Sequence, residues 1–569
     1  MNGCENMINE LKIEIKKALE AFFKQNYDLE INIVVEEPKK AEMGDISIPS
    51  FSVVKALRRP LPECANIIKD EVVKFDYVLD ANVMGGFVNL TINKSYVSSC
   101  ILKQILDEKE NYAGSEKNGK NIVIDYSSPN IAKPFSIGHL RSTIIGHSLK
   151  LIYLKAGYNV IGINHLGDWG SQFGKVIVAY KKWGSEESVK EDSLSELAKL
   201  YVRFHQEAKE DPSLDDEARE VFMKLEQGNE EYLKLWQWFR AESVKEAMNL
   251  YEMLDVSFDS YNGEAFFNDK MDGVVKELEE KNLLVLDDGA SIVKLDDDMP
   301  PALIKRRDGA SLYITRDLAA VFYRKKTYSF NKCLYVVGNE QKLHFNQLKK
   351  VIEKMGYDYG EQIYHINFGF VLRNGKKMST RDGGVTTLKD VLNEAIKAAY
   401  NQINIKNPSL EDKENIAKNI GVGAVIFNDL KNHRSLDYEF NIDQMLKFEG
   451  QTGPYIQYTG VRINSILREN KIDEKINYDV FLKQHYFDVV KLLDQFKDMI
   501  NRAINENAPS VICKYLLSIA QEFNVFYAKE KILTDDLETR NANLLLITAV
   551  KIVLEEGLRL VGIKSLERM

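Results

Sequence analysis

Residues that could bind phosphate gather where a predicted strand gives way to a predicted helix, around Gly138 and His139. The glycine lets backbone come close to a ligand, and the amides that open the helix have no intrahelical partners and face an anion at the positive end of the dipole. The side chains of His139 and Lys133 would add hydrogen-bond donors. A bare Gly-His pair is usually an ordinary helix start with a surface histidine, so the surrounding residues must decide between that interpretation and a nucleotide-phosphate site.

A second candidate is the glycine-flanked segment NGKKMSTRDGG, residues 374–384, where cations cluster. A loop that carries cations can stabilise the negative charge that builds on the β- and γ-phosphates of a nucleotide as pyrophosphate leaves. Such a segment alone is more often plain surface. This segment follows the first candidate in the chain and is separated from it by a β-rich half-fold.

The elements that would position these residues form a βαβ unit. The β-branched run from Ile122 to Tyr126 predicts a buried strand, and residues 158–166 predict a second strand after the helix. At this spacing the connection is right-handed, and ligands bind at the carboxyl ends of the parallel strands. His165 and Gln172, within HLGDWGSQFG, would lie at that rim, although either could instead be a structural cap.

The string SSPNIAKPFSIGHLRSTIIG, residues 127–146, resembles almost letter for letter the first signature region of class I arginyl-tRNA synthetases. KMSTR, residues 377–381, is similar to the Lys-Met-Ser-Lys-Ser loop of the same class. One position departs from the family pattern, because Ser136 stands where the first histidine of the His-x-Gly-His tetrapeptide is expected. The two-imidazole contact of the family with ATP is therefore reduced to His139 plus a hydroxyl.

The resemblance implies roles for particular residues. It implies catalytic roles for His139, Lys377, Ser136 and Lys133. It implies ATP contacts from Gly138, His139, Lys377, Met378, Ser379, Arg381 and His344. It implies an arginine pocket made by Asn130, Glu264, Tyr313, Asp317 and Gln341.

The chemistry of an arginine side chain supports one of these assignments independently. A guanidinium needs carboxylate acceptors in its plane, and burying it unpaired would cost several kcal/mol. Asp317 and Tyr313, one helical turn apart, fit that need. Asp317 could equally be half of a surface ion pair with Arg316 or Arg324, which is the commoner fate of an isolated aspartate.

From about residue 391 to the end the pattern becomes helical, which predicts a separate all-α domain. Aromatic residues at helical spacing there are usually core. In the family the corresponding tyrosines line the anticodon pocket, where rings stack on splayed bases. The resemblance implies anticodon contacts from Tyr455, Tyr458, Tyr527 and Met569.

A chain of 569 residues is too long for one core, and we predict three domains. Residues 1–115 form an α+β N-terminal domain that resembles the tRNA-elbow-binding domain of the family, with helices expected over 7–23 and 60–75 and strands over 29–35 and 87–92. Residues 116–390 form a Rossmann-type α/β catalytic domain, interrupted by a mainly helical insertion over about 182–300. Residues 391–569 form the helical anticodon-binding domain.

Composition excludes several classes of protein. The net charge of −9 argues weakly against a nucleic-acid partner, but eleven Lys and Arg face three Asp and Glu within residues 301–350, so a basic region could sit on an acidic protein. The five cysteines are far apart, and we expect neither a disulfide framework nor zinc. No run has the length of a membrane span, and the first residues lack a signal layout. We expect a cytoplasmic monomer.

The resemblance covers essentially the whole chain and implies an arginine–tRNA ligase. ATP with Mg²⁺ would activate arginine as the adenylate, and the arginyl group would pass to the 3′ end of tRNA(Arg). Two alternatives stay open. One is a small-molecule nucleotidylyltransferase with a Gly-His signature, and the other is a non-catalytic tRNA-binding relative, which the serine at position 136 suggests.

Overall fold

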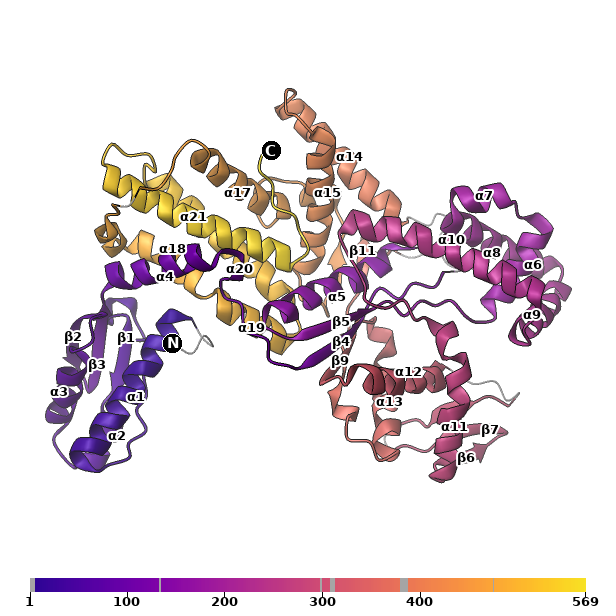
Figure 1. Cartoon of the computed structure of the whole chain (residues 1–569), viewed down its shortest axis with the longest axis horizontal. Coiled ribbons are helices and arrows are strands. Elements are labelled where there is room, and N and C mark those ends of the chain that lie inside the picture. Colours follow the sequence, from indigo (N-terminus) through magenta and orange to yellow (C-terminus); the bar gives the residue numbers. More distant parts are fainter. Residues whose placement is uncertain (1–5, 132–134, 297–298, 308–312, 379–386, 474) are drawn as a thin grey trace.

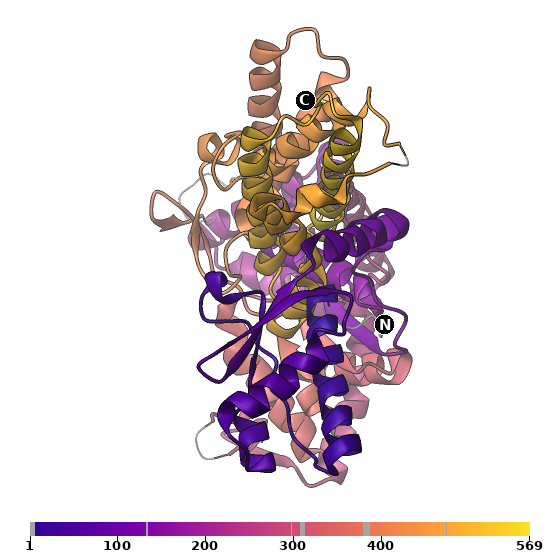
Figure 2. The same cartoon turned by 90° about the vertical axis from the view of Figure 1, so that its left-hand side faces the viewer.

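The computed structural model describes residues 6–131, 135–296, 299–307, 313–378, 387–473 and 475–569. Its described parts form an N-terminal α+β unit, a central parallel sheet, a helical arm and a large helical region (Figure 1). The side view places the helical region above the N-terminal unit (Figure 2). No described helix is long and apolar enough to cross a membrane.

The N-terminal unit packs helices against a three-stranded antiparallel sheet of order β1-β3-β2. Its elements are α1 (Met7–Tyr27), β1 (Ile46–Pro49), α2 (Phe51–Leu57), α3 (Leu61–Val72), β2 (Val78–Met84), β3 (Phe87–Ile92) and α4 (Lys94–Glu108). The predicted helices and the strand over 87–92 are present. The strand predicted over 29–35 is wrong: Ile31 and Ile33 are buried, so the alternating pattern is real, but the segment has no ladder partner within the described structure.

The central sheet has four parallel strands in the order β10-β9-β4-β5. The strands are β4 (Asn121–Asp125), β5 (Asn159–Ile163), β9 (Lys332–Tyr335) and β10 (Ile363–His365), and α5 (Ile137–Lys155) connects β4 to β5. The chain leaves β4 toward one edge and β9 toward the other, so the strand order reverses between them. Ligands bind at such a switch point, outside the carboxyl ends of the strands.

Close packing of α5 on β4 depends on a glycine. A Cβ at Gly146 would lie 2.2 Å from the Cβ of Tyr126, the residue that follows β4. Any side chain there would push the helix off the sheet, and with it the residues at its N-terminal end.

The helical arm follows β5 (Figure 1). It contains α6 (Gln172–Trp183), α7 (Glu186–Glu191), α8 (Ser193–Glu210), α9 (Ser213–Glu226) and α10 (Glu230–Leu254). The chain then makes the 3₁₀ turn η3 (Glu264–Lys270) and α11 (Met271–Glu280) before a small antiparallel sheet of β6 (Leu284–Asp287), β7 (Ala290–Val293) and β8 (Ala302–Lys305). The sequence pattern did not predict that sheet. The second half of the central fold resumes with α12 (Tyr313–Tyr328) and α13 (Lys342–Lys354).

The C-terminal region consists mainly of α14 (Leu388–Lys406), α15 (Lys413–Leu430), α16 (Ile442–Met445), α17 (Gly453–Leu467), α18 (Gln484–Asp494), α19 (Phe496–Glu506), α20 (Ser510–Lys529) and α21 (Leu537–Leu560). It is not purely helical. The two-residue strand β13 (Tyr438–Glu439) pairs in parallel with β11 (Val371–Arg373), which forms a hairpin with β12 (Lys376–Lys377). The helical region therefore supports the second candidate segment directly.

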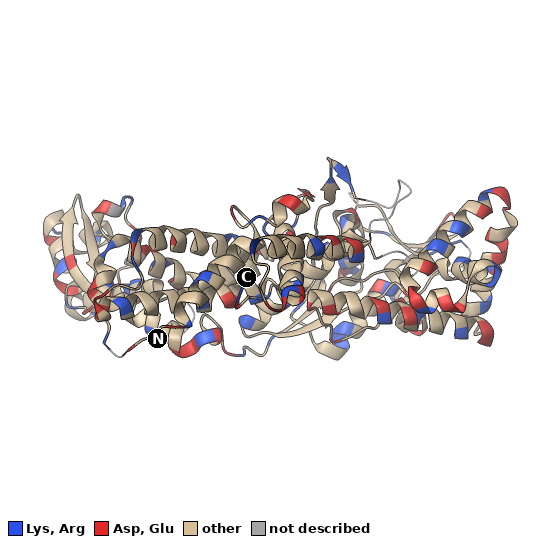
Figure 3. Ribbon diagram, turned by 90° about the horizontal axis from the view of Figure 1, so that it is seen from above, with Lys and Arg blue, Asp and Glu red and all other residues tan. Residues whose placement is uncertain are grey.

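Basic and acidic residues, coloured blue and red on the ribbon of Figure 3, are interspersed along the elements. One continuous hydrophobic core joins the N-terminal unit, α5 and the C-terminal helices. Displacements of α5 would therefore be felt across the packed core.

Candidate active site

The first candidate stretch begins α5 with a local cap. Ser136 has extended backbone, and its N–H donates to Nδ1 of His139 over 3.0 Å, while its hydroxyl oxygen lies 3.2 Å from the same nitrogen. An imidazole nitrogen that accepts an N–H is unprotonated, so the neutral ring carries its proton on Nε2 and can donate there. Ser136 thus orients His139, and Gly138 is exposed in front of them.

The second candidate stretch lies beside the first. Nζ of Lys377, on β12, is 3.3 Å from Oε1 of Glu340 and 3.6 Å from the ring centroid of Phe370. A cavity of about 150 Å³ is lined by residues of both stretches, including Gly138, Lys377 and Met378. The predicted site residues Lys133, Ser379 and Arg381 lie outside the described residues.

Asp317, on α12, faces His344 of α13. Nε2 of His344 lies 2.6 Å from the carboxylate. Burial opposes ionisation of Asp317, but the hydrogen bond to His344 and the charges of His344, His165 and Arg324 together lower the pKa of the carboxyl below its ordinary value. The alternative surface pairs are not formed, since Arg316 lies 3.7 Å from Glu264 and Arg324 lies 2.7 Å from Asp125.

Glu264, the first residue of η3, is a second acidic group near Asp317. Burial raises its pKa to about 7, and the negative charges of Asp317 and Asp168 add to that effect, although Arg316 opposes it. Partly buried carboxylates that repel one another favour the binding of a cation. Two such groups, one on η3 and one on α12, suit a ligand that carries positive charge at both ends.

Asp168 of the HLGDWG string holds Glu264 in place. Its buried carboxylate lies 2.7 Å from Nε of Arg240 on α10 and accepts the N–H of Ala265 over 2.9 Å. The backbone N–H of Glu264 donates to the carbonyl of Leu166. The helical arm thereby positions a residue of the acidic pocket.

The other residues predicted for the arginine pocket are Asn130, Tyr313 and Gln341. Asn130 forms a backbone bridge with Gly167, beside the HLGDWG string. Tyr313 is 67% exposed and Gln341 is also exposed, and neither is hydrogen-bonded to Asp317 or Glu264 in the described part of the chain.

The two residues expected at the sheet rim differ in their contacts. Nδ1 of His165 lies 3.4 Å from Arg324, and burial lowers the pKa of its imidazole. Gln172 instead donates over 2.9 Å to the carbonyl of Trp169, just before the start of α6.

The ion pair at the carboxyl end of β4 was not predicted from the sequence. The guanidinium of Arg324 lies 2.7 Å from Asp125, and both side chains are almost fully buried. Burial opposes the charge of Arg324, but Tyr335 and Asp125 raise its pKa. A charged residue that ends an apolar strand was the available signal, because a buried carboxylate needs a partner.

Backbone strain follows that strand. Ser127 and Ser128 have φ values of 70° and 45°, which non-glycine residues rarely adopt. Buried hydroxyls stabilise the turn: Oγ of Ser127 lies 2.8 Å from Oη of Tyr251, and Thr143 donates to Ser127 over 2.8 Å. Strain held by its surroundings clusters at functional sites, and serine in the sequence gives no sign of it.

A buried ion pair ties α5 to the helical region. Nε of Arg141 lies 3.1 Å from Asp429 of α15, and each side chain is 1% exposed. The guanidinium also donates to the carbonyls of Leu436 and Arg434 over 3.0 and 3.2 Å. These carbonyls precede β13, so Arg141 connects the first candidate stretch to the hairpin that carries Lys377.

The three tyrosines predicted to contact the anticodon lie on α17 and α20. The guanidinium of Arg462 lies 5.9 Å from the ring centroid of Tyr458 and 4.3 Å from that of Tyr527, and Tyr458 is 41% exposed. Asn524 donates to the hydroxyl of Tyr455 over 2.8 Å. Three tyrosines therefore share one surface region.

Met569 is half-buried and packs against the large hydrophobic core. Asn464 and Arg468 of α17 donate to the carbonyls of Leu566 and Glu567, which hold the C-terminal segment against that helix.

Comparison with known sequence families gives three matches along the chain. The family described as the Arginyl tRNA synthetase N terminal domain matches residues 9–92. The family described as tRNA synthetases class I (R), catalytic domain, matches residues 101–442. The DALR anticodon binding domain family matches residues 456–569.

Whole proteins match over nearly their full lengths. An arginine–tRNA ligase of Exiguobacterium sibiricum is 50% identical over 543 residues, which cover 95% of this chain and 96% of that protein. One of Enterococcus faecalis is 49% identical over 567 residues, 98% and 99% of the two chains. The structure of arginyl-tRNA synthetase from Thermus thermophilus has the same fold, with a TM-score of 0.79 at 23% identity over 98% of this chain and 100% of that one.

Proposed function

The chain belongs to the class I arginyl-tRNA synthetases, and we propose that the surfaces described above divide the work of its reaction among them. The protein is an arginine–tRNA ligase. In that reaction the arginine carboxylate attacks the α-phosphate of ATP and pyrophosphate leaves. A hydroxyl at the tRNA 3′ end then attacks the carbonyl of the arginyl-adenylate, the arginyl group passes to the tRNA, and AMP leaves. Neither step needs a covalent enzyme intermediate, so positioning and electrostatics supply most of the rate.

The main support for an ATP site is the cavity that Gly138, Lys377 and Met378 line together. These residues come from stretches far apart in the sequence, and a phosphate group in the cavity would contact both. The first turn of α5 and Nε2 of His139 would donate to the phosphates. Lys377 rests on Glu340 and would exchange that carboxylate for a phosphate. Mg²⁺ bound to the phosphates of ATP would neutralise part of their charge.

The acidic pocket between η3 and α12 would bind arginine. Asp317 would accept the guanidinium, and Glu264 would accept the α-amino group. A cation at each position would favour the ionised carboxylate and relieve the repulsion between the two acids. Three further residues would join this pocket if their side chains move toward arginine or ATP when these bind: Asn130, Tyr313 and Gln341.

The tyrosine cluster of α17 and α20 would bind the anticodon of tRNA(Arg). Tyr458 is exposed enough to stack on a base, and Arg462 supplies a cation between the rings. Met569 would lie at the edge of this surface. We further propose a cytoplasmic monomer with domain boundaries near residues 115 and 390.

The serine at position 136 is compatible with catalysis. Its backbone, rather than a second imidazole, orients His139. The experiment that tests the function is ATP-dependent charging of bulk tRNA with labelled arginine by the purified protein. Arginyl-tRNA is the expected product. A non-catalytic relative would bind tRNA without charging it, and a nucleotidylyltransferase would consume ATP without any need for tRNA.

A further inference from the structure

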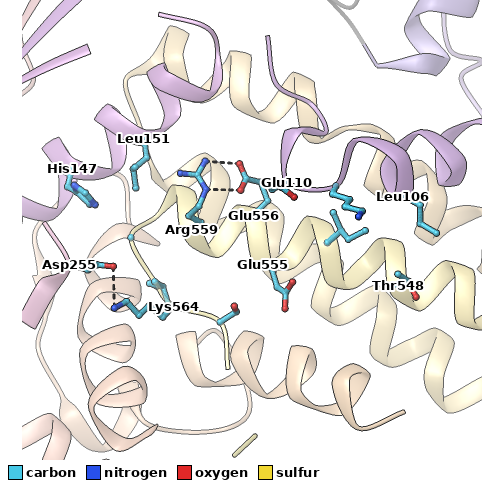
Figure 4. Close-up of a pocket in the computed structure, with 15 residues that line it drawn as sticks. Leu106, Glu110, His147, Leu151, Asp255, Thr548, Glu555, Glu556, Arg559 and Lys564 are labelled. Carbon is cyan, nitrogen blue, oxygen red and sulfur yellow. Dashed lines mark hydrogen bonds and ion pairs between the residues drawn. The ribbon is translucent and has the colours of Figure 1, made fainter. Parts of the chain in front are cut away.

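A cavity of about 880 Å³ lies where α4, α5, α21 and the C-terminal segment meet (Figure 4). It is separate from the proposed ATP cavity and is several times larger. Its volume falls in the range of sites for small organic ligands, roughly 300–1,000 Å³. Nothing in the reaction described above uses it.

The wall of this junction cavity is largely apolar. Leu106 of α4, Leu151 of α5, Ile552 of α21 and Ile563 of the C-terminal segment line it. Gly562 turns that segment with a φ of 71°, and a Cβ at this position would lie 3.3 Å from the ring of His147. The left-handed turn keeps the C-terminal segment close to α5, so this segment forms one wall of the cavity.

His147 lines the cavity from α5 and is 8% exposed. Its Nδ1 is buried and has no hydrogen-bond partner within the described structure. Burial lowers the pKa of the imidazole to about 4, so the ring is neutral at physiological pH. A buried polar atom left without a partner is costly, and a ligand with a polar group would remove that cost.

The charged groups around the cavity differ in the ion pairs that they form. Glu556 binds Lys155 at 3.0 Å and Arg559 at 2.7 Å, and Asp255 lies 3.4 Å from Lys564. These contacts use Arg559 and Lys564, as Figure 4 shows, whereas Lys109 and Glu110, which also line the cavity, are exposed.

Glu555 differs from Glu556 in its ion pairs. It is half-buried, and in the described part of the chain its ion pair is with Lys551, one turn earlier on α21, at 3.4 Å. Burial raises the pKa of its carboxyl, and Glu567 adds to that effect. An anionic ligand would meet Glu555 and Glu556 together, whereas a cation would be attracted by Glu555.

From the apolar wall, the unpartnered His147 and the carboxylate of Glu555, we propose that the junction cavity binds an organic cation with an apolar body. The apolar body would pack on the leucine and isoleucine side chains, and the ammonium or guanidinium group would pair with Glu555. His147 lies about 12 Å along α5 from His139. A ligand here therefore contacts the helix that presents the active site without entering it.

The test uses the full-length protein and the fragment 4-phenylbutylamine, with 4-phenylbutanoate as its anionic match, in isothermal titration calorimetry. The titrations contain saturating L-arginine, because an amine could otherwise enter the acidic arginine pocket. We expect saturable binding of the amine with a Kd on the order of 1 mM, as its size allows, and at least tenfold weaker binding of the carboxylate.

Three variants separate this cavity from other surfaces. Glu555→Gln should weaken amine binding about tenfold, because it removes the charge and keeps the shape. Ile552→Trp should abolish binding by filling the cavity. Glu538→Gln, an exposed position at the other end of α21, is the matched control and should bind as the wild type does. No saturable binding up to about 5 mM amine, or binding that both cavity variants leave unchanged, would overturn the proposal.

Discussion

Replacing Arg141 by methionine should destabilise the protein strongly. The substitution removes the cation from Asp429, which is 1% exposed, and leaves that carboxylate buried and unpaired. Breaking a buried ion pair from one side typically costs about 3–5 kcal/mol. Burial already raises the pKa of Asp429, so its charge depends on Arg141.

Removing both charges separates stability from function. In Arg141→Met/Asp429→Leu the charge penalty disappears, but the carbonyl of Leu436 loses its donor, at roughly 1–3 kcal/mol if left unsatisfied. The carbonyl of Arg434 loses one of two donors and keeps the N–H of Gly369. We expect the double variant to recover at least half of the stability lost by the single one. If Arg141 also positions the two candidate stretches, the double variant should still lose about tenfold in kcat. Its KM for ATP should rise while its KM for arginine is unchanged.

The assays are urea unfolding and steady-state charging of tRNA at a temperature where each variant is folded. Arg141→Lys serves as a conservative match, since it keeps a charge but cannot reach the carboxylate and both carbonyls together. A single variant as stable as the wild type would refute the electrostatic argument. A double variant with normal kcat and normal KM for ATP would show that the pair is purely structural.

Five further substitutions test individual groups. Asp317→Asn should raise the arginine KM strongly and leave the ATP KM nearly unchanged in steady-state charging, because it removes charge at the guanidinium end only. Burial raises the pKa of Glu264 to about 7, so the carboxylate needed for the α-amino group is fully present only above that pH; the arginine KM should fall as pH rises through 7, and Glu264→Gln should flatten this profile. Ser136→Ala should lower kcat less than about tenfold, since the backbone N–H orients the imidazole, and His139→Ala should be worse. Tyr458→Ala should weaken tRNA binding in a filter-binding assay by roughly 1–3 kcal/mol, with no effect on ATP.

Local patterns were sufficient to predict the centre of the fold. The β-branched run before residue 127 forms β4, and the spacing to the next apolar run gives the parallel β4-α5-β5 unit. These predictions hold because a buried strand and a short crossover are decided by nearby residues. The strand predicted over 29–35 failed because alternation reports burial of one face, whereas a ladder needs a partner elsewhere in the chain.

Long-range partners could not be predicted from spacing. Asp317 pairs with His344 rather than with either neighbouring arginine, and Arg141 meets Asp429 across 288 positions. The helical pattern after residue 391 likewise concealed β13, because a two-residue strand leaves no periodic signal. In each case the partner is chosen by tertiary packing.

The most direct test of the account is a structure of the protein with a non-hydrolysable arginyl-adenylate analogue, such as arginyl sulfamoyl adenosine. We predict that the adenosine lies between Gly138 and Met378, that the guanidinium is within hydrogen-bond distance of Asp317, and that the α-amino group faces Glu264. An analogue bound with its guanidinium away from Asp317, or with its adenosine outside the cavity that the two candidate stretches share, would contradict the account.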